Sequence, residues 1–316
     1  MRPLLAMLCA ALLCTAHAQN YPSKPVRLIV PFPPGGSNDV VARSIATQLS
    51  DKLGQSVVVD NRGGAGGTIG INAAAKSPAD GYTLLLVSVG YAMNMALGQL
   101  PPDSPKWFTP VAMLGSGPSV LAVTASLPVG SVKELIALAR QKPGELNVGS
   151  AGIGSFQHLA SELFRMQAGI DVLIVQYKGG GPALTDLIGG QVQISMGSLL
   201  QTLPHIRSGK LKALGVGSLK RNAALPEVPT IAEAGIPGFE AINWWGILAP
   251  AGTPAPVLGR LHEDISAILA SPETQKRFEL EGASVAQSAP VEFGRYILAE
   301  THKWTQVVKQ AGIKAE

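Results

Sequence analysis

The stretch Val26–Arg43, VRLIVPFPPGGSNDVVAR, constrains the fold more than any other part of the chain. An apolar strand at Val26–Val30 breaks at prolines and two glycines, and the chain then enters an amphipathic helix through a Ser/Asn/Asp segment. This order places unpaired backbone N–H groups and the positive end of a helix dipole at the carboxyl edge of a strand. Small anionic ligands bind at that position in open α/β sheets, so the stretch predicts an anion-binding site.

Segments typical of strands and of helices alternate along nearly the whole chain, which predicts an α/β fold. The first of the helices is expected over about Asn38–Leu53, where apolar residues recur at helical spacing. We expect one discontinuous lobe from residues 19–122 plus 244–316 and a second, inserted lobe from residues 123–243. Two strands that cross between the lobes would form a hinge, with a ligand cleft between the lobes.

Residues 1–18 have the pattern of a secretory signal peptide. An arginine near the start precedes an apolar run, and the segment ends in the small-x-small sequence AHA. We expect cleavage after Ala18 and export to the periplasm or an equivalent extracytoplasmic space. Both cysteines, Cys9 and Cys14, lie in this segment, so the mature chain is expected to use no disulfide, thiolate or Cys-based metal chemistry.

The charge pattern argues against nucleic acid as a partner. The chain has 25 lysines and arginines against 21 acidic residues, a formal net charge of +4. The basic residues are scattered along the sequence, whereas a nucleic-acid surface needs them clustered. We therefore expect no nucleic-acid partner, and the slight positive balance is weak support for an anionic solute.

Three glycine-rich loops connect expected strands to expected helices: Pro34–Asp39, Gly63–Thr68 and Ser150–Ser155. Glycine lets a ligand approach the backbone, so each loop can present amide donors. None has the G-x-G-x-x-G or G-x-x-x-x-G-K-[ST] spacing of a nucleotide site. Each loop alone is also explained as an ordinary turn and helix cap, but three of them favour a shared anion site.

Side chains suited to catalysis are few. The sequence has neither a G-x-S-x-G elbow nor an H-E-x-x-H pair. His158 follows the third loop, and packing behind that loop is favoured over a direct role. Asp39 is expected to have a structural role, as a carboxylate in the first helical turn that interacts with the helix dipole and caps the helix start. Tyr91 either packs half-exposed or reaches the cleft from a loop, and one ring of Trp244–Trp245 is expected in the cleft wall. We expect no catalytic residue, metal or cofactor.

Seven motifs, taken in order, resemble the extracytoplasmic solute receptors of tripartite tricarboxylate transporters, the Bug family. They are YPSKPVRLIVPFPPGGSNDVVAR, NRGGAGGTIGINAAAKSPADGYTLLL, VGSAGIGSFQHLASELF, VQYKGGGPALTDLIGGQV, LPHIRSGKLKALGV, LPEVPTIAEAGIPGFE and GILAPAGTP. The resemblance covers essentially the whole mature chain. It implies a type II-like, two-lobed periplasmic-binding-protein fold (a Venus flytrap) with two hinge crossings. It also implies delivery of a small carboxylate to a permease of one large and one small membrane subunit.

The resemblance further implies which loops hold the ligand. In that family the loop after the first strand and the Gly/Ser loop of the second lobe pinch one carboxylate, through backbone amides and ordered waters. Amide donors suit a carboxylate because charged hydrogen bonds are strong and need no titrating partner. With Tyr91 and His158 added from the residue patterns, the candidate ligand-binding residues are Pro34, Gly35, Gly36, Ser37, Asp39, Gly67, Thr68, Ser88, Tyr91, Ser150, Ala151, Gly152, Gly154, Ser155 and His158.

One departure from the family pattern bears on the ligand. After GGQV, many relatives carry an acidic and then an aromatic residue, but Val192–Ser198 has neither. An acid there could hold an α-ammonium, so its absence argues against an amino-acid ligand. The leading hypothesis is a monomeric periplasmic receptor for a mono-, di- or tricarboxylate or an aromatic acid. The alternatives are a partner that presents its ligand to a signalling receptor, and an exported enzyme using His158 or Asp39.

Overall fold

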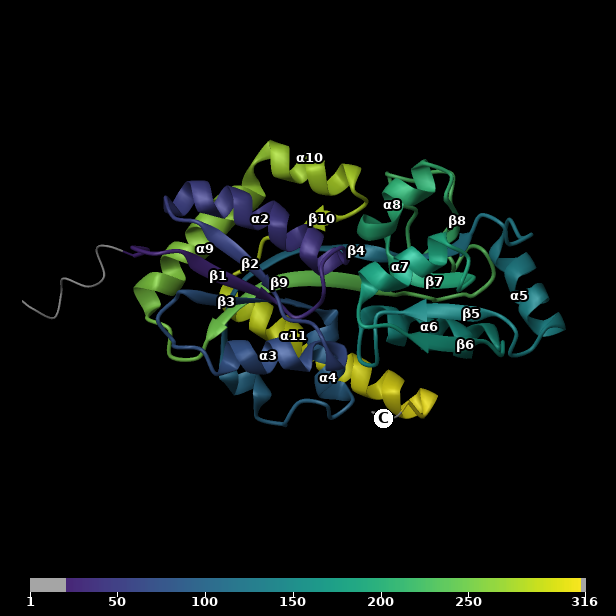
Figure 1. Ribbon diagram of the computed structural model, residues 1–316, viewed down its shortest axis with the longest axis horizontal. Helices are drawn as coiled ribbons and strands as arrows, with labels where there is room; N and C mark the ends of the chain where they lie inside the picture. The colour runs from purple at the N-terminus through teal and green to yellow at the C-terminus, as the bar shows by residue number, and fades with distance from the viewer. Residues whose placement is uncertain (1–20, 314–316) are drawn as a thin grey trace, which may run out of the picture.

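The computed structural model describes residues 21–313, which form two α/β lobes joined by long strands (Figure 1). The expected signal peptide at residues 1–18 and its cleavage site lie outside the described residues. Within the described range, no helix combines the length and apolar character needed to cross a membrane.

Lobe 1 is built on three parallel strands in the order β2-β1-β3, extended by antiparallel partners. Its apolar strands alternate with amphipathic helices, which bury one face each against the sheet. Its strands are β1 (Val26–Val30), β2 (Val57–Asn61), β3 (Thr83–Ser88) and β10 (Ser284–Val285). Its helices are α2 (Ser37–Leu53), α3 (Thr68–Ala75), α4 (Val89–Ala96), α9 (Ala255–Ala270), α10 (Pro272–Leu280) and α11 (Pro290–Ala311), with 3₁₀ turns η1 (Ala65–Gly67) and η2 (Ser104–Trp107).

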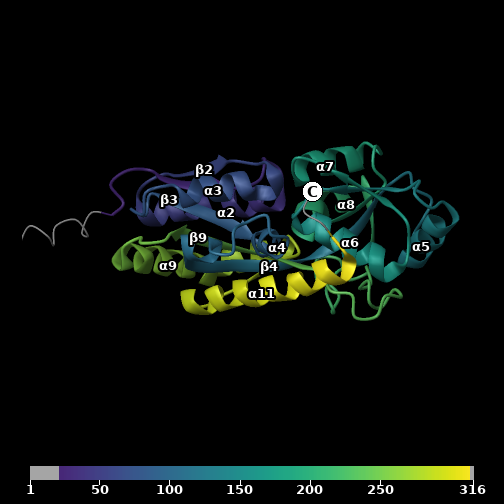
Figure 2. The same ribbon diagram turned by 90° about the horizontal axis from the view of Figure 1, so that it is seen from below.

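Lobe 2 repeats this plan with the parallel order β7-β5-β6. Its strands are β5 (Asn147–Ser150), β6 (Leu173–Gln176), β7 (Ile194–Ser198) and β8 (Leu211–Val216). Its helices are α5 (Val132–Gln141), α6 (Phe156–Ala168), α7 (Gly180–Ile188) and α8 (Leu199–Arg207). The helix α11 lies along lobe 1, and its last turns reach α6 of lobe 2 (Figure 2).

Two segments carry the chain between the lobes. In β4 (Phe108–Thr124), residues up to Pro118 pair with β9 (Ile242–Pro250), whereas residues from Ser119 onward pair with β7 and β8. The return crossing lies beside it, where the Ser119 amide donates to the Ala241 carbonyl. The lobe boundaries at residues 122 and 243 stay a prediction.

The parallel strands of each lobe end at the gap between the lobes. Phe32 follows β1 and Ser88 ends β3 in lobe 1, while Ala151 follows β5 and Ser198 ends β7 in lobe 2, and all four line one cavity. Ligands bind at the carboxyl ends of parallel strands in open α/β sheets. Here two such edges face each other.

One expectation about local structure is wrong. Tyr91, expected in a loop, lies in α4, which begins directly after β3 with no intervening turn. The helix α8 also begins directly after a strand, β7. In each case the serine that ends a buried strand is also the N-cap of the helix, so no turn separates the strand from the helix.

Candidate functional site

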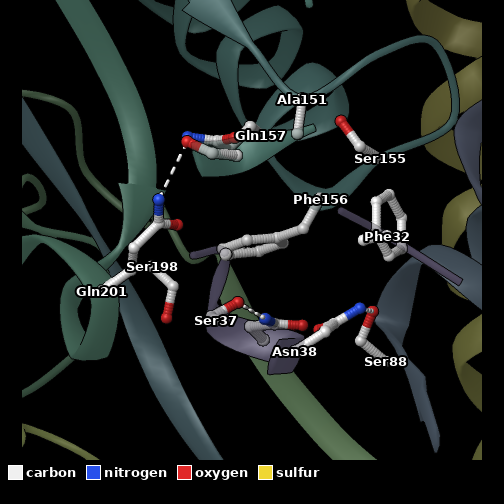
Figure 3. A pocket seen from close by; sticks show the side chains of 13 residues that line it. Phe32, Ser37, Asn38, Ser88, Ala151, Ser155, Phe156, Gln157, Ser198 and Gln201 are labelled. Carbon is white, nitrogen blue, oxygen red and sulfur yellow. Dashed lines mark hydrogen bonds between the residues drawn. The ribbon is translucent and has the colours of Figure 1, made fainter. Parts of the chain in front are cut away.

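A cavity of about 40 Å³ lies between the lobes (Figure 3). Its walls come from both lobes, and none of these described lining residues carries a charge. The lining residues are Phe32, Gly36, Ser37, Asn38, Ser88 and Asn243 from lobe 1 and its crossing strand, and Ala151, Ser155, Phe156, Gln157, Gly180, Ser198 and Gln201 from lobe 2.

Five helices begin at this cavity. They are α2, α4, α6, α7 and α8, and the residues at their starts that line the cavity are Gly36, Ser88, Ser155, Gly180 and Ser198. The first amides of a helix have no acceptor within the helix, and each start carries about half a positive charge. Only α6 has a side-chain cap among these five. The cavity therefore suits an anion although no cation lines it.

A hydrogen-bond relay from the core orients Ser88. The indole Nε1 of Trp245, which can only donate, donates to Asn38 Oδ1 at 3.1 Å. The Asn38 Nδ2 group then donates to Ser88 Oγ at 3.3 Å. Because the Ser88 oxygen accepts this bond, its own O–H remains available to donate to a ligand.

Two more hydroxyl groups are oriented in the same way. Asn243 Oδ1 accepts from the Trp244 amide at 3.0 Å, so its Nδ2 faces Ser37 Oγ, 3.5 Å away. Ser155 Oγ caps α6 by accepting from the His158 amide at 3.2 Å. The O–H groups of Ser37, Ser88 and Ser155 are thus all free to donate into the cavity, which is the arrangement that a carboxylate needs.

The lobes also approach each other closely at glycines beside the cavity. A Cβ built on Gly181, in α7, would lie 2.6 Å from the Pro34 carbonyl oxygen and 3.5 Å from the Gly35 carbonyl carbon. A Cβ on Gly36 would lie 4.0 Å from the Gly180 and Gly181 amides. Glycine at position 181 therefore permits a closed arrangement that any larger residue obstructs.

Five of the fifteen candidate residues line the cavity. They are Gly36, Ser37, Ser88, Ala151 and Ser155. The others lie in the same loops or in the layer behind them, outside the lining. They are Pro34, Gly35, Asp39, Gly67, Thr68, Tyr91, Ser150, Gly152, Gly154 and His158.

Asp39 holds the first loop from behind. Its carboxylate accepts from the Gly35 amide at 3.1 Å, from Arg43 Nε at 3.0 Å and from Asn61 Nδ2 at 3.0 Å. Burial alone would raise the pKa of the Asp39 carboxyl, but the bonds from Arg43, Gly35 and Asn61 outweigh it and lower this pKa. Because Gly35 donates to Asp39, that amide is already engaged within lobe 1.

His158 packs behind the second loop. Its Nδ1 accepts from the Gly154 amide at 3.4 Å, so the imidazole is neutral with its proton on Nε2. Burial lowers the pKa of His158, and Glu162 opposes this shift. Tyr91 is buried too, and its hydroxyl donates to the Ser104 carbonyl at 3.2 Å. These contacts assign packing roles to both side chains.

The expectation that one of the paired tryptophans forms the cleft wall is wrong. Both Trp244 and Trp245 are fully buried, and neither lines the cavity. Trp244 donates to Glu300 Oε2 at 3.3 Å and packs edge-on against Phe293. Trp245 contributes to the site through its hydrogen bond to Asn38.

The far end of the cavity consists of residues that the sequence patterns do not single out. Figure 3 shows Gln157, Gln201 and Ser198 on one side of the Phe156 ring, with Phe32 on the other. Gln157 and Gln201 lie at the second and third positions of α6 and α8. A glutamine in the first turn of a helix is common, so only the three-dimensional convergence identifies these two.

Comparison with known proteins defines the class to which this fold and site belong. Residues 41–313 match the family described as "Tripartite tricarboxylate transporter family receptor". The chain belongs to this family of solute-binding receptors, which are not enzymes, and the resemblance stated above is confirmed. The two-lobed periplasmic-binding-protein fold is confirmed with it.

Particular relatives cover almost the whole chain. Protein BugT of Bordetella pertussis is 41% identical over 308 residues, 96% of this chain and 94% of its own. The R. palustris protein Rpa4515, solved with adipate, is 40% identical with a TM-score of 0.90, covering 93% of this chain and 99% of its own. MatC from Rhodopseudomonas palustris, solved with bound malate, is 34% identical with a TM-score of 0.87, covering 91% and 100%.

Proposed function

We propose that this protein is a periplasmic receptor that captures a small organic carboxylate between its lobes and delivers it to a tripartite membrane transporter. The convergence of five helix N-termini on one cavity without charged walls carries the proposal. Backbone amides and three serine hydroxyls would hold the anion, so binding needs no titrating group. The adipate- and malate-bound relatives support the same class of ligand.

In this proposal the carboxylate lies between the starts of α2 and α6. The amides of Ser37 and Asn38 approach it from lobe 1, and those of Phe156 and Gln157 from lobe 2. A ligand that contacts both lobes favours the closed arrangement over the open one by its differential affinity. The closed receptor would then be the form that docks on the large and small membrane subunits.

Substitution of Gly36 tests the carboxylate site. Gly36 has φ −84° and ψ 167°, which other residues adopt, and a Cβ there meets nothing closer than 4.0 Å. Gly36→Val should therefore fold, but its methyl groups extend toward the carboxylate position. We expect calorimetry with succinate, malate, glutarate and adipate to show binding to the wild type and none to Gly36→Val. Gly259→Val, an exposed control in α9 with open space around the Cβ, should bind normally.

Two results would contradict the proposal. Unchanged affinity in Gly36→Val would remove this loop from the site. Delivery is tested separately, by capture of detergent-solubilised membrane proteins on the ligand-loaded receptor. We expect to recover the two transporter subunits, and recovery of a signalling receptor in their place would overturn delivery while leaving carboxylate capture intact.

A further inference from the structure

The far end of the cavity carries hydrogen-bond acceptors that have no partner. Gln157 is 6% exposed and its Oε1 atom accepts no hydrogen bond, while its Nε2 donates to Ser195 Oγ at 3.3 Å. A buried amide oxygen without a donor costs about 1–3 kcal/mol. A ligand group that donates to Gln157 Oε1 would remove that cost.

Gln201 adds a second acceptor at the same place. Its Nε2 donates to the Gly180 carbonyl at 2.8 Å, and because a carbonyl can only accept, Oε1 is the atom left over. A Cβ built on Gly180 would lie 3.0 Å from Gln201 Oε1 and 3.3 Å from Gln157 Oε1. Two amide oxygens therefore flank one point of the cavity wall.

Donors reach this end as well. Ser198 stands at the N-cap of α8, yet its hydroxyl caps nothing, is buried and makes no hydrogen bond. The first amides of α8 also lack acceptors within their helix. The far end thus offers two acceptors beside a hydroxyl and a helix start, with no cation or carboxylate among the described lining residues.

We propose that the receptor selects an acid whose second end is a neutral group that both donates and accepts hydrogen bonds, a primary amide or a hydroxyl. The NH₂ or OH group would donate to Gln157 and Gln201, and its oxygen would accept from Ser198 or the start of α8. A second carboxylate has only acceptors and would face two amide oxygens without a counter-ion. A terminal ammonium would be buried without an anionic partner. This inference rests on the proposed carboxylate receptor function.

A matched set of ligands tests the selection. Adipate, adipamate and 6-aminohexanoate share a chain and one carboxylate but end in a carboxylate, an amide and an ammonium. The corresponding five- and four-carbon sets, built on glutarate and succinate, allow for chain length. We expect calorimetry at pH 7 to give the amide at least about tenfold tighter binding than the dicarboxylate and the amino acid of the same length, since one hydrogen bond to a buried, otherwise unpaired group is worth that much.

A variant separates the far end from the carboxylate end. Gln157→Met keeps the length of the side chain and removes the acceptor, so the preference for the amide should fall below about threefold while dicarboxylate binding persists. Gln167→Met, at an exposed position of the same helix, should keep the full preference. If Gln157→Met does not fold, the three wild-type affinities decide the question alone.

The outcomes distinguish the two proposals. If the dicarboxylate or the amino acid binds as tightly as the amide, the selection of a neutral second end is wrong and the carboxylate receptor stands. If the preference for the amide survives in Gln157→Met, the recognition assigned to Gln157 is wrong. If no acid in any of the three sets binds, both the proposed function and this inference fail.

Discussion

The contact of Gly181 with Pro34 provides a test of lobe closure that leaves the cavity lining untouched. Gly181→Ala adds a Cβ 2.6 Å from the Pro34 carbonyl oxygen. Non-bonded carbon and oxygen atoms normally lie more than about 3 Å apart, so this position is a steric clash. The clash involves the other lobe, so it exists only when the lobes are closed. Opening the lobes relieves it without disturbing either core.

The expected effect follows from two opposing terms. Overpacking of this kind costs about 1–3 kcal/mol in the closed form, which lowers ligand affinity by about 5- to 150-fold. In the ligand-free protein, alanine in place of glycine within α7 should leave stability unchanged or raise it by up to about 1 kcal/mol. Loss of affinity without loss of stability is the signature of obstructed closure.

Calorimetry with the tightest-binding acid measures the loss of ligand affinity, and thermal unfolding of the ligand-free protein measures the change in stability. Gly189→Ala is the matched control, because it lies at the end of the same helix and its Cβ would meet nothing closer than the Thr185 carbonyl at 3.5 Å. We expect that control to bind like the wild type. Wild-type affinity in Gly181→Ala would refute the closed arrangement as the ligand-bound one.

Two further predictions concern the groups behind the loops. Asp39→Ala should lower stability by about 1–3 kcal/mol and weaken carboxylate binding, because the Gly35 amide loses its acceptor and the first loop loses its support. Asp51→Ala, at an exposed position of α2, is the control and should change neither quantity. His158 has a folded-state pKa below its unfolded value of about 6.5, so the unfolded chain takes up this proton first and stability falls as pH drops below about 6.5. Urea unfolding between pH 5 and pH 8 should show this dependence reduced in His158→Gln, and an identical pH profile would contradict the neutral His158 that accepts from Gly154.

The first half of the site is predictable from local sequence. The strand–proline–glycine–helix order at Val26–Arg43 places the start of α2 correctly, and the serine at position 155 predicts the start of α6 in the same way. In both segments an apolar strand, a glycine-rich turn and an amphipathic helix follow within a few residues. Short-range patterns of this kind are visible in a single sequence.

The second half depends on contacts between distant residues. The relay that orients Ser88 joins Trp245 to Asn38, which are 207 positions apart. The helices α4 and α8 begin where buried strands end, so the cavity-facing Ser88 and Ser198 belong to a strand and cap a helix at once, with no turn between the two elements. The pairing of Gln157 with Gln201 across Gly180 likewise exists only once the parallel strands of lobe 2 are assembled.

The most direct test of an anion site formed by helix starts is a comparison of one ligand in charged and neutral forms. The tightest-binding acid is titrated against the wild type beside the same molecule with every carboxyl group converted to a primary amide, which keeps the shape and removes the charge. Because hydrogen bonds to a charged group contribute about 1.5–3 kcal/mol each, we expect the neutral molecule to bind at least about 100-fold more weakly. Equal affinity for the two would contradict the account.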